Sequence, residues 1–220
     1  MAARRRLASR ACVALAQAMC WLALTALNLP AVAQPAISSA ESSAPAPEAA
    51  LEGARLVDAL RRGGLVVYFR HTATDFSRDD RQMTGYSDCE RQRPPTDQGQ
   101  RDAQEIGQRI RALGLPVGEA LASPMCRTME HARLMLGEVT GDDAVRESAG
   151  GDFAGLKRLL ALAPAAGNRW IVGHGIPFRA VAGPPHLAEG EAAVVRPETN
   201  GWTVVARLQV GDWQTLPLVQ

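Results

Sequence analysis

The sequence predicts an α/β fold: a single three-layer domain with a largely parallel central sheet and helices on both faces. Two short apolar runs, "LVVYF" at 65–69 and "WIVG" at 170–173, are typical of strands buried on both faces. Amphipathic segments of helical period lie between these runs, and strands that alternate with helices favour a parallel sheet. The segment 51–220 is long enough for one domain with its own core.

The first half of this domain is predicted to begin with a helix. "LEGARLVDALRRGG" (51–64) has apolar residues at helical spacing and ends at two glycines, a common stop signal. The strand 65–69 follows, and the polar stretch 72–95 predicts a long loop because it contains a glycine and two prolines. The segment 96–114 predicts an amphipathic helix with Thr96 as its N-cap.

The second half continues the alternation and then adds two consecutive strands. The predicted elements are a strand at 119–123, a helix at 124–137, a helix at 153–163, a strand at 169–174, and strands at 191–197 and 201–210.

The first 33 residues have the pattern of a secretory signal. Four arginines precede an apolar stretch at 11–27, and "AVAQ" supplies the small residues that a signal peptidase reads, which predicts cleavage after Ala33. A retained membrane anchor is the alternative, because the apolar stretch is near spanning length. Residues 34–50, rich in Pro, Ala and Ser, predict a disordered linker. We therefore expect a periplasmic or secreted protein without a membrane span after signal removal.

The charge of the predicted mature chain argues against nucleic acid as a partner. The whole chain has 24 basic and 23 acidic residues, and residues 1–33 hold four arginines and no acids, which leaves 24 − 4 = 20 basic residues and a net charge of −3. Binding to a phosphate backbone needs a basic footprint, so any anion site must be local.

Two cysteines, Cys89 and Cys126, remain in the predicted domain, whereas Cys12 and Cys20 lie in the signal. A disulfide between the remaining pair is plausible in an oxidising compartment, and two buried free thiols are the alternative.

Basic and imidazole side chains cluster at the predicted carboxyl ends of three strands. Arg70 and His71 follow the first strand, His174 ends another, and Arg127 lies in the first turn of the helix after the third. Ligands bind at this edge of open α/β sheets. Guanidinium groups match phosphate oxygens, and a histidine among positive charges stays neutral and nucleophilic.

Metal chemistry fits this cluster poorly. The sequence has no HxxxH or CxxC pair, and arginines would repel a cation. We therefore expect no metal and no other cofactor.

Three segments resemble the signatures of a known family. "FRHTATD", "SPMCRTMEHA" and "IVGHG" are similar, in this order, to those of the histidine phosphatase superfamily (phosphoglycerate-mutase-like), in particular its small periplasmic members. The resemblance implies that His71 is the nucleophile and that Arg70, Arg127 and His174 hold the phosphoryl group. It also places Thr74 near the phosphate.

The sequence departs from the family pattern at Thr72, where the family has glycine. If that glycine supplies a positive φ or room beside the substrate, Thr72 narrows the pocket. The general acid of the family lies between the second and third signatures, where Glu147 and Asp152 are the candidates. Glu189 is expected either to border the pocket or to be solvated, as is Glu191. His131 lies one helical turn after Arg127 and either braces it or is an interior or surface histidine.

Together these features predict an exported hydrolase that cleaves a small phosphomonoester through a phosphohistidine on His71. Two alternatives stay open: a phosphohistidine phosphatase acting on a protein, and a non-catalytic relative that binds phosphate.

Overall fold

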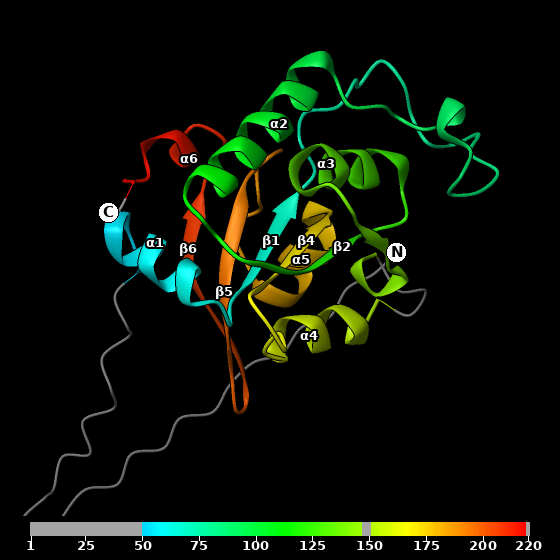
Figure 1. Cartoon of the computed structure of the whole chain (residues 1–220). Coiled ribbons are helices and arrows are strands. Elements are labelled where there is room, and N and C mark those ends of the chain that lie inside the picture. Colours follow the sequence, from blue (N-terminus) through cyan, green and yellow to red (C-terminus); the bar gives the residue numbers. More distant parts are fainter. Residues whose placement is uncertain (1–49, 147–150, 219–220) are drawn as a thin grey trace, which may run out of the picture. The chain divides into compact units, whose positions relative to one another are not determined.

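The structure is a computed structural model that describes residues 50–146 and 151–218 (Figure 1). Within these residues the central sheet has six strands. Their order is β3-β2-β4-β1-β5-β6. The pairs β1–β4, β2–β4 and β2–β3 are parallel, whereas β1–β5 and β5–β6 are antiparallel. The prediction of a largely parallel sheet is confirmed. The strands are β1 Val66–Arg70, β2 Val117–Ala122, β3 Thr140–Gly141, β4 Asn168–Gly173, β5 Ala192–Glu198 and β6 Gly201–Leu208.

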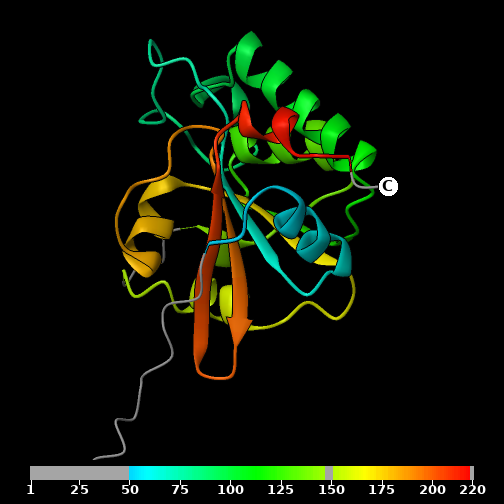
Figure 2. The same ribbon diagram turned by 90° about the vertical axis from the view of Figure 1, so that its left-hand side faces the viewer.

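Helices cover both faces of the sheet, as Figure 2 shows with α1 and α2 on one side and α5 on the other. One hydrophobic cluster joins the sheet to α1, α2, α3 and α6, and a second joins it to α4 and α5. The helices are α1 Gly53–Arg62, α2 Asp97–Ala112, α3 Cys126–Leu136, α4 Ala154–Ala161, α5 Gly175–Ala182 and α6 Asp212–Thr215, with 3-10 turns η1 Cys89–Arg91 and η2 Asp143–Val145.

Strand β1 explains how a continuous apolar run serves both layers. Successive side chains of a strand point to opposite faces. Val67 and Phe69 belong to the cluster beneath α1 and α2, whereas Val66 and Tyr68 belong to the cluster beneath α4 and α5. All four are fully buried, so β1 is the centre of the core.

Several elements were not predicted. The eight-residue helix α5 follows His174 directly, and its third residue is Pro177, which reads as a break in a sequence although the first turn of a helix accepts it. The two-residue strand β3 and the short α6 are below the length at which periodicity is visible.

Some predictions fall outside the described residues. These are the signal peptide at 1–33, the linker at 34–50 apart from its last residue, and Glu147. No helix in the ranges that the structure covers is long and apolar enough to cross a bilayer.

The parallel strands bring their carboxyl ends to one edge. Arg70 ends β1, Gly173 ends β4 beside it, and Ser123 follows β2. The backbone N–H of Ser123 donates to Val172 O of β4. This edge carries the candidate site.

Candidate active site

Hydrogen bonds from both neighbouring strands fix the backbone where β1 ends. Arg70 N donates to Glu191 O at 3.1 Å on the β5 side, and His71 N donates to Gly173 O at 3.0 Å on the β4 side. His71 is buried, with 3% of its surface exposed. The first signature segment is therefore held rigidly.

The imidazole of His71 is oriented by the next residue. Nδ1 lies 2.9 Å from Thr72 O, and because a carbonyl oxygen only accepts, Nδ1 carries the proton and Nε2 keeps its lone pair. Burial is the main cause that lowers the pKa of His71 to about 2. The hydrogen bond to Thr72 O acts against this shift, and the charges of His174, Arg127 and Arg70 add to it. The ring is neutral at pH 7, as a nucleophile requires.

His174 stands beside this ring, with centroids 5.6 Å apart and planes inclined by 72°. Its Nε2 lies 2.9 Å from Ser123 Oγ. The buried hydroxyl of Tyr68 accepts from His174 N and donates to His174 O, both at 2.9 Å. Burial, followed by the charges of Arg127 and Arg146, lowers the pKa of His174 to about 3. Sequence reasoning missed Tyr68 and Ser123.

Close packing explains the glycines on either side of His174. A Cβ on Gly173 would lie 2.1 Å from the Tyr68 hydroxyl oxygen. A Cβ on Gly175 would lie 2.4 Å from His186 Nε2 and 3.1 Å from Arg70 Cδ. The G-H-G segment is thus required by contact with the site, not by φ.

Arg127 projects from the start of α3 and is 7% exposed. Its Nη1 donates to both carboxylate oxygens of Asp80, at 3.1 and 3.0 Å, while its buried Nε has no partner among the described residues. Burial lowers the pKa of Arg127, whereas the negative charge of Asp80 acts to raise it. The first N–H of the helix, Cys126 N, already donates to Gln92 Oε1, so it is not free for an anion.

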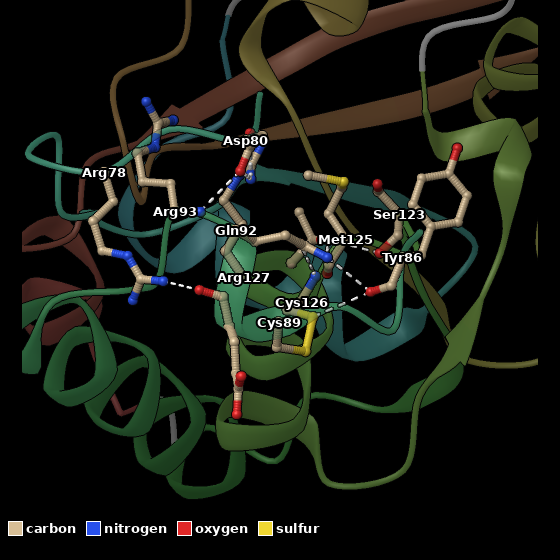
Figure 3. The surroundings of a disulfide bond; sticks show 12 residues. Arg78, Asp80, Tyr86, Cys89, Gln92, Arg93, Ser123, Met125, Cys126 and Arg127 are labelled. Atoms are coloured by element: carbon tan, nitrogen blue, oxygen red, sulfur yellow. Dashed lines mark hydrogen bonds and ion pairs between the residues drawn. A yellow bond between two sulfur atoms is a disulfide. The ribbon is translucent and has the colours of Figure 1, made fainter. Parts of the chain in front are cut away.

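The loop that supplies Asp80 is tied to α3 by a disulfide between Cys89 and Cys126, whose Cα atoms are 5.6 Å apart (Figure 3). Gln92 adds two bonds, because it also donates from Nε2 to Tyr86 O at 2.8 Å. The loop and Arg127 therefore form one connected unit.

Thr74 and Glu189 lie together on the Nδ1 side of His71. Thr74 Oγ1 donates to Glu189 Oε1 at 2.8 Å, and the same oxygen lies 3.6 Å from Arg70 Nη2 and 3.8 Å from His71 Nδ1. Thr74 is buried, and neither residue lines the cavity described below. Glu189 therefore faces the Nδ1 side of His71 rather than Nε2, and Thr74 braces Glu189.

Other predicted residues lie elsewhere. Asp152 is exposed, accepts from Ala154 N at the start of α4, and does not line the cavity. Thr72 is buried with a φ outside the left-handed region, and its Cγ2 faces Gly190, so it does not narrow the cavity. His131 accepts from Thr72 N at 3.2 Å through Nδ1 and so braces the segment that follows β1 rather than Arg127.

A cavity of about 270 Å³ collects the four core residues of the prediction. Its lining also includes two further arginines and an exposed histidine. The lining residues are Arg70, His71, Arg93, Arg127, Arg146, His174, Gly175, Ile176, Pro177 and His186. Elsewhere in the described ranges, no three His, Cys, Asp or Glu side chains gather as metal ligands do.

Comparison with solved structures identifies the fold. The protein histidine phosphatase SixA, complexed with tungstate, aligns with a TM-score of 0.50 and 16% identity over 67% of this chain and 98% of that chain. A phosphoserine phosphatase from Entamoeba histolytica, in complex with 3-phosphoglyceric acid, aligns with a TM-score of 0.51 and 14% identity over 68% and 98%. No curated protein matches the sequence significantly.

The model of the histidine phosphatase superfamily (branch 1) matches residues 66–175, half of the chain. This match begins at β1 and ends one residue after His174, so it contains all four residues that sequence reasoning placed around the phosphoryl group. The chain therefore belongs to the histidine phosphatase superfamily.

Proposed function

We propose that this chain is an exported, metal-independent phosphatase that hydrolyses a small phosphomonoester through a phosphohistidine on His71. One observation carries the proposal: a neutral imidazole with a free Nε2 lies in a cavity with Arg70, Arg127 and His174. The chemistry of phosphoryl transfer needs positioning and positive charge more than covalent help from other groups.

The reaction divides into two displacements at phosphorus. Nε2 of His71 attacks phosphorus, the P–N bond forms, and the P–O bond breaks. The leaving group departs with the electron pair and takes a proton from solvent, which the water of the second step returns. Arg70, Arg127 and His174 hold the nonbridging oxygens, so their charge is balanced as the transition state develops. Water then attacks the phosphorus, the P–N bond breaks, and inorganic phosphate leaves with Nε2 free again.

Glu189 supports this cycle from the opposite side of the ring. Once Nε2 carries the phosphoryl group, Nδ1 stays protonated and the imidazole gains positive charge. Glu189 Oε1, 3.8 Å from Nδ1, stabilises that charge and also anchors Arg70. We assign it a positioning role, not that of the acid that protonates the leaving group.

Turnover of p-nitrophenyl phosphate by residues 34–220 in excess EDTA tests the proposal, because this leaving group needs little acid assistance. We expect turnover that His71→Ala abolishes, and an acid-labile phosphoryl group on His71 after rapid quenching. Binding of phosphate without any turnover would instead show a non-catalytic relative.

A phosphohistidine phosphatase acting on a protein is the second candidate, and the cavity lining favours it in one respect. No carboxylate of the described residues lines the cavity, and an imidazole leaving group needs less help from an acid than an alkoxide. Comparing hydrolysis of a phosphohistidine-bearing protein with that of small alkyl phosphates separates the two: a ratio of kcat/KM strongly in favour of the protein would replace our first choice.

Export is part of the proposal and has its own test. The signal pattern at 1–33 supports it, and so does the disulfide between Cys89 and Cys126. Expression of the full chain in a Gram-negative host should give a periplasmic product whose N-terminus is Gln34. A full-length, membrane-bound product would contradict cleavage.

A further inference from the structure

Two arginines line the cavity beyond those that the phosphoryl group uses. Arg93 comes from the loop that follows β1, next to the buried Gln92, and Arg146 comes from the end of η2. They lie 53 positions apart in the sequence, so their meeting at one cavity is a product of the fold.

The guanidinium group of each of these arginines lies over an aromatic ring rather than against a carboxylate, although the backbone N–H of Arg93 donates to Asp80 Oδ1 at 2.8 Å. Arg93 Cζ lies 4.3 Å from the ring centroid of Phe76, and Arg146 Cζ lies 4.8 Å from that of Tyr86. Neither side chain forms an ion pair with a described residue, and the buried Nε of Arg93 has no hydrogen-bond partner there.

Arg70 and Arg127, by contrast, each have a carboxylate nearby. Glu189 lies 3.6 Å from Arg70, and Asp80 binds Arg127. Among the described residues, these four guanidinium groups therefore meet two carboxylates, and the two side chains without an ion-pair partner there are those of Arg93 and Arg146.

Both surplus charges act on the phosphoryl site. The charge of Arg93 lowers the pKa of Arg70, Arg127 and His174, and that of Arg146 lowers the pKa of Arg127 and His174. Burial is the larger cause of these shifts, and the position of both arginines beside the phosphoryl site follows from the shared cavity lining. The cavity has a volume of only about 270 Å³, so one small molecule bound at the phosphoryl site also lies near Arg93 and Arg146.

We propose that Arg93 and Arg146 form a second anion subsite and that the substrate is a small phosphomonoester with a second anionic group, a carboxylate or another phosphate. This inference rests on the proposed phosphatase function. The phosphoryl group is bound by Arg70, Arg127 and the two histidines, and the second anion by Arg93 and Arg146, whose aromatic supports hold the guanidinium planes in place.

General attraction of anions is the rival explanation, since a positive cleft raises the local concentration of any negative ligand. Such attraction acts alike on all anions of equal charge and is screened by salt. A subsite instead depends on where the second charge is placed within the ligand.

Calorimetric binding of phosphonates, which cannot be hydrolysed at their P–C bond, tests the subsite independently of turnover. The probes are methylphosphonate, with one anionic group, and phosphonoacetate, 3-phosphonopropionate and methylenediphosphonate, with two. We expect at least one two-anion probe to bind about tenfold or more tightly than methylphosphonate at physiological salt, the value of one charge-assisted contact.

Arg146→Gln and Arg93→Gln should each remove most of this advantage, so that the ratio of two-anion to methylphosphonate affinity falls toward one. Arg146 lies outside the loop tied by the disulfide, so its variant stays informative if Arg93→Gln disturbs the loop. Arg101→Gln on the exposed face of α2 is the matched control and should retain the advantage.

Two results would overturn the subsite: equal affinity for all probes, or an advantage that survives both substitutions. Failure of the phosphatase proposal would look different, because p-nitrophenyl phosphate would then not be hydrolysed whatever the phosphonates do.

Discussion

Replacing Tyr68 by phenylalanine removes the one oxygen atom that contacts both backbone groups of His174. The ring stays, and with it the stacking on Phe178 at 4.7 Å between centroids. The hydroxyl is fully buried, so no solvent replaces it, and His174 loses an acceptor for its N–H and a donor to its C=O at once.

The expected cost follows from these two bonds. A buried polar group left without a partner costs about 1–3 kcal/mol, and the relief of no longer burying the hydroxyl offsets part of it. We expect the free energy of unfolding to fall by about 2–3 kcal/mol. Because His174 then shifts relative to His71, we also expect kcat on p-nitrophenyl phosphate to fall about tenfold, which corresponds to about 1.4 kcal/mol of transition-state stabilisation.

Urea denaturation and steady-state kinetics measure the two quantities on the same preparation. Tyr86→Phe is the matched control because Tyr86 is the other tyrosine of the chain, is 38% exposed, and uses its ring and backbone rather than its hydroxyl in the described contacts. Its stability should stay within about 0.5 kcal/mol of the parent. If Tyr68→Phe also stays within that range, the hydroxyl does not hold His174 and the reasoning fails.

Three further predictions concern the surroundings of the site. Glu189→Gln should slow phosphohistidine formation about tenfold, because the developing imidazolium of His71 loses a negative neighbour; an unchanged burst rate would refute this. Replacing Cys89 and Cys126 by serine should lower the free energy of unfolding by about 4 kcal/mol in the chain-entropy estimate for a sequence separation of 37. It should also raise KM more than it lowers kcat; thermal unfolding and kinetics check both effects, and equal stability would contradict the prediction. Acid should destabilise the fold, because burial lowers the pKa of His131 to about 3. Below pH about 6.5 the unfolded chain binds a proton that the folded chain does not, so this group alone lowers the free energy of unfolding by about 1.4 kcal/mol per pH unit. In urea titrations at several pH values, His131→Asn should show a dependence of the unfolding free energy on pH that is shallower by that amount.

The sequence predicts the centre of the site well because the centre lies on strand ends. Arg70, His71 and His174 follow apolar runs whose period and length are plain, and parallel strands bring such ends together. Arg127 follows from the helix start after Pro124 by the same logic. For these residues, local pattern and global topology agree.

The supporting residues could not be predicted because their signals are absent from the local pattern. Tyr68 lies inside an apolar run, where its hydroxyl is hidden behind its ring. Glu189 reaches Thr74 across 115 positions, and Asp80 reaches Arg127 across 47, through loops whose course no periodicity describes. For His131 the sequence left open whether it braces Arg127; the fold instead buries it in contact with Thr72, which lies 59 positions away.

The two glycines around His174 also predict how unevenly this segment accepts change. At Gly173 even one methyl group would collide with the buried Tyr68 hydroxyl, which makes two hydrogen bonds to His174. Alanine there should therefore disrupt the core around Tyr68. At Gly175 the obstacle is chiefly the exposed side chain of His186, which can swing aside into solvent. Saturation mutagenesis should therefore find that Gly173 tolerates no other amino acid, whereas Gly175 tolerates small side chains that change the shape of the cavity entrance.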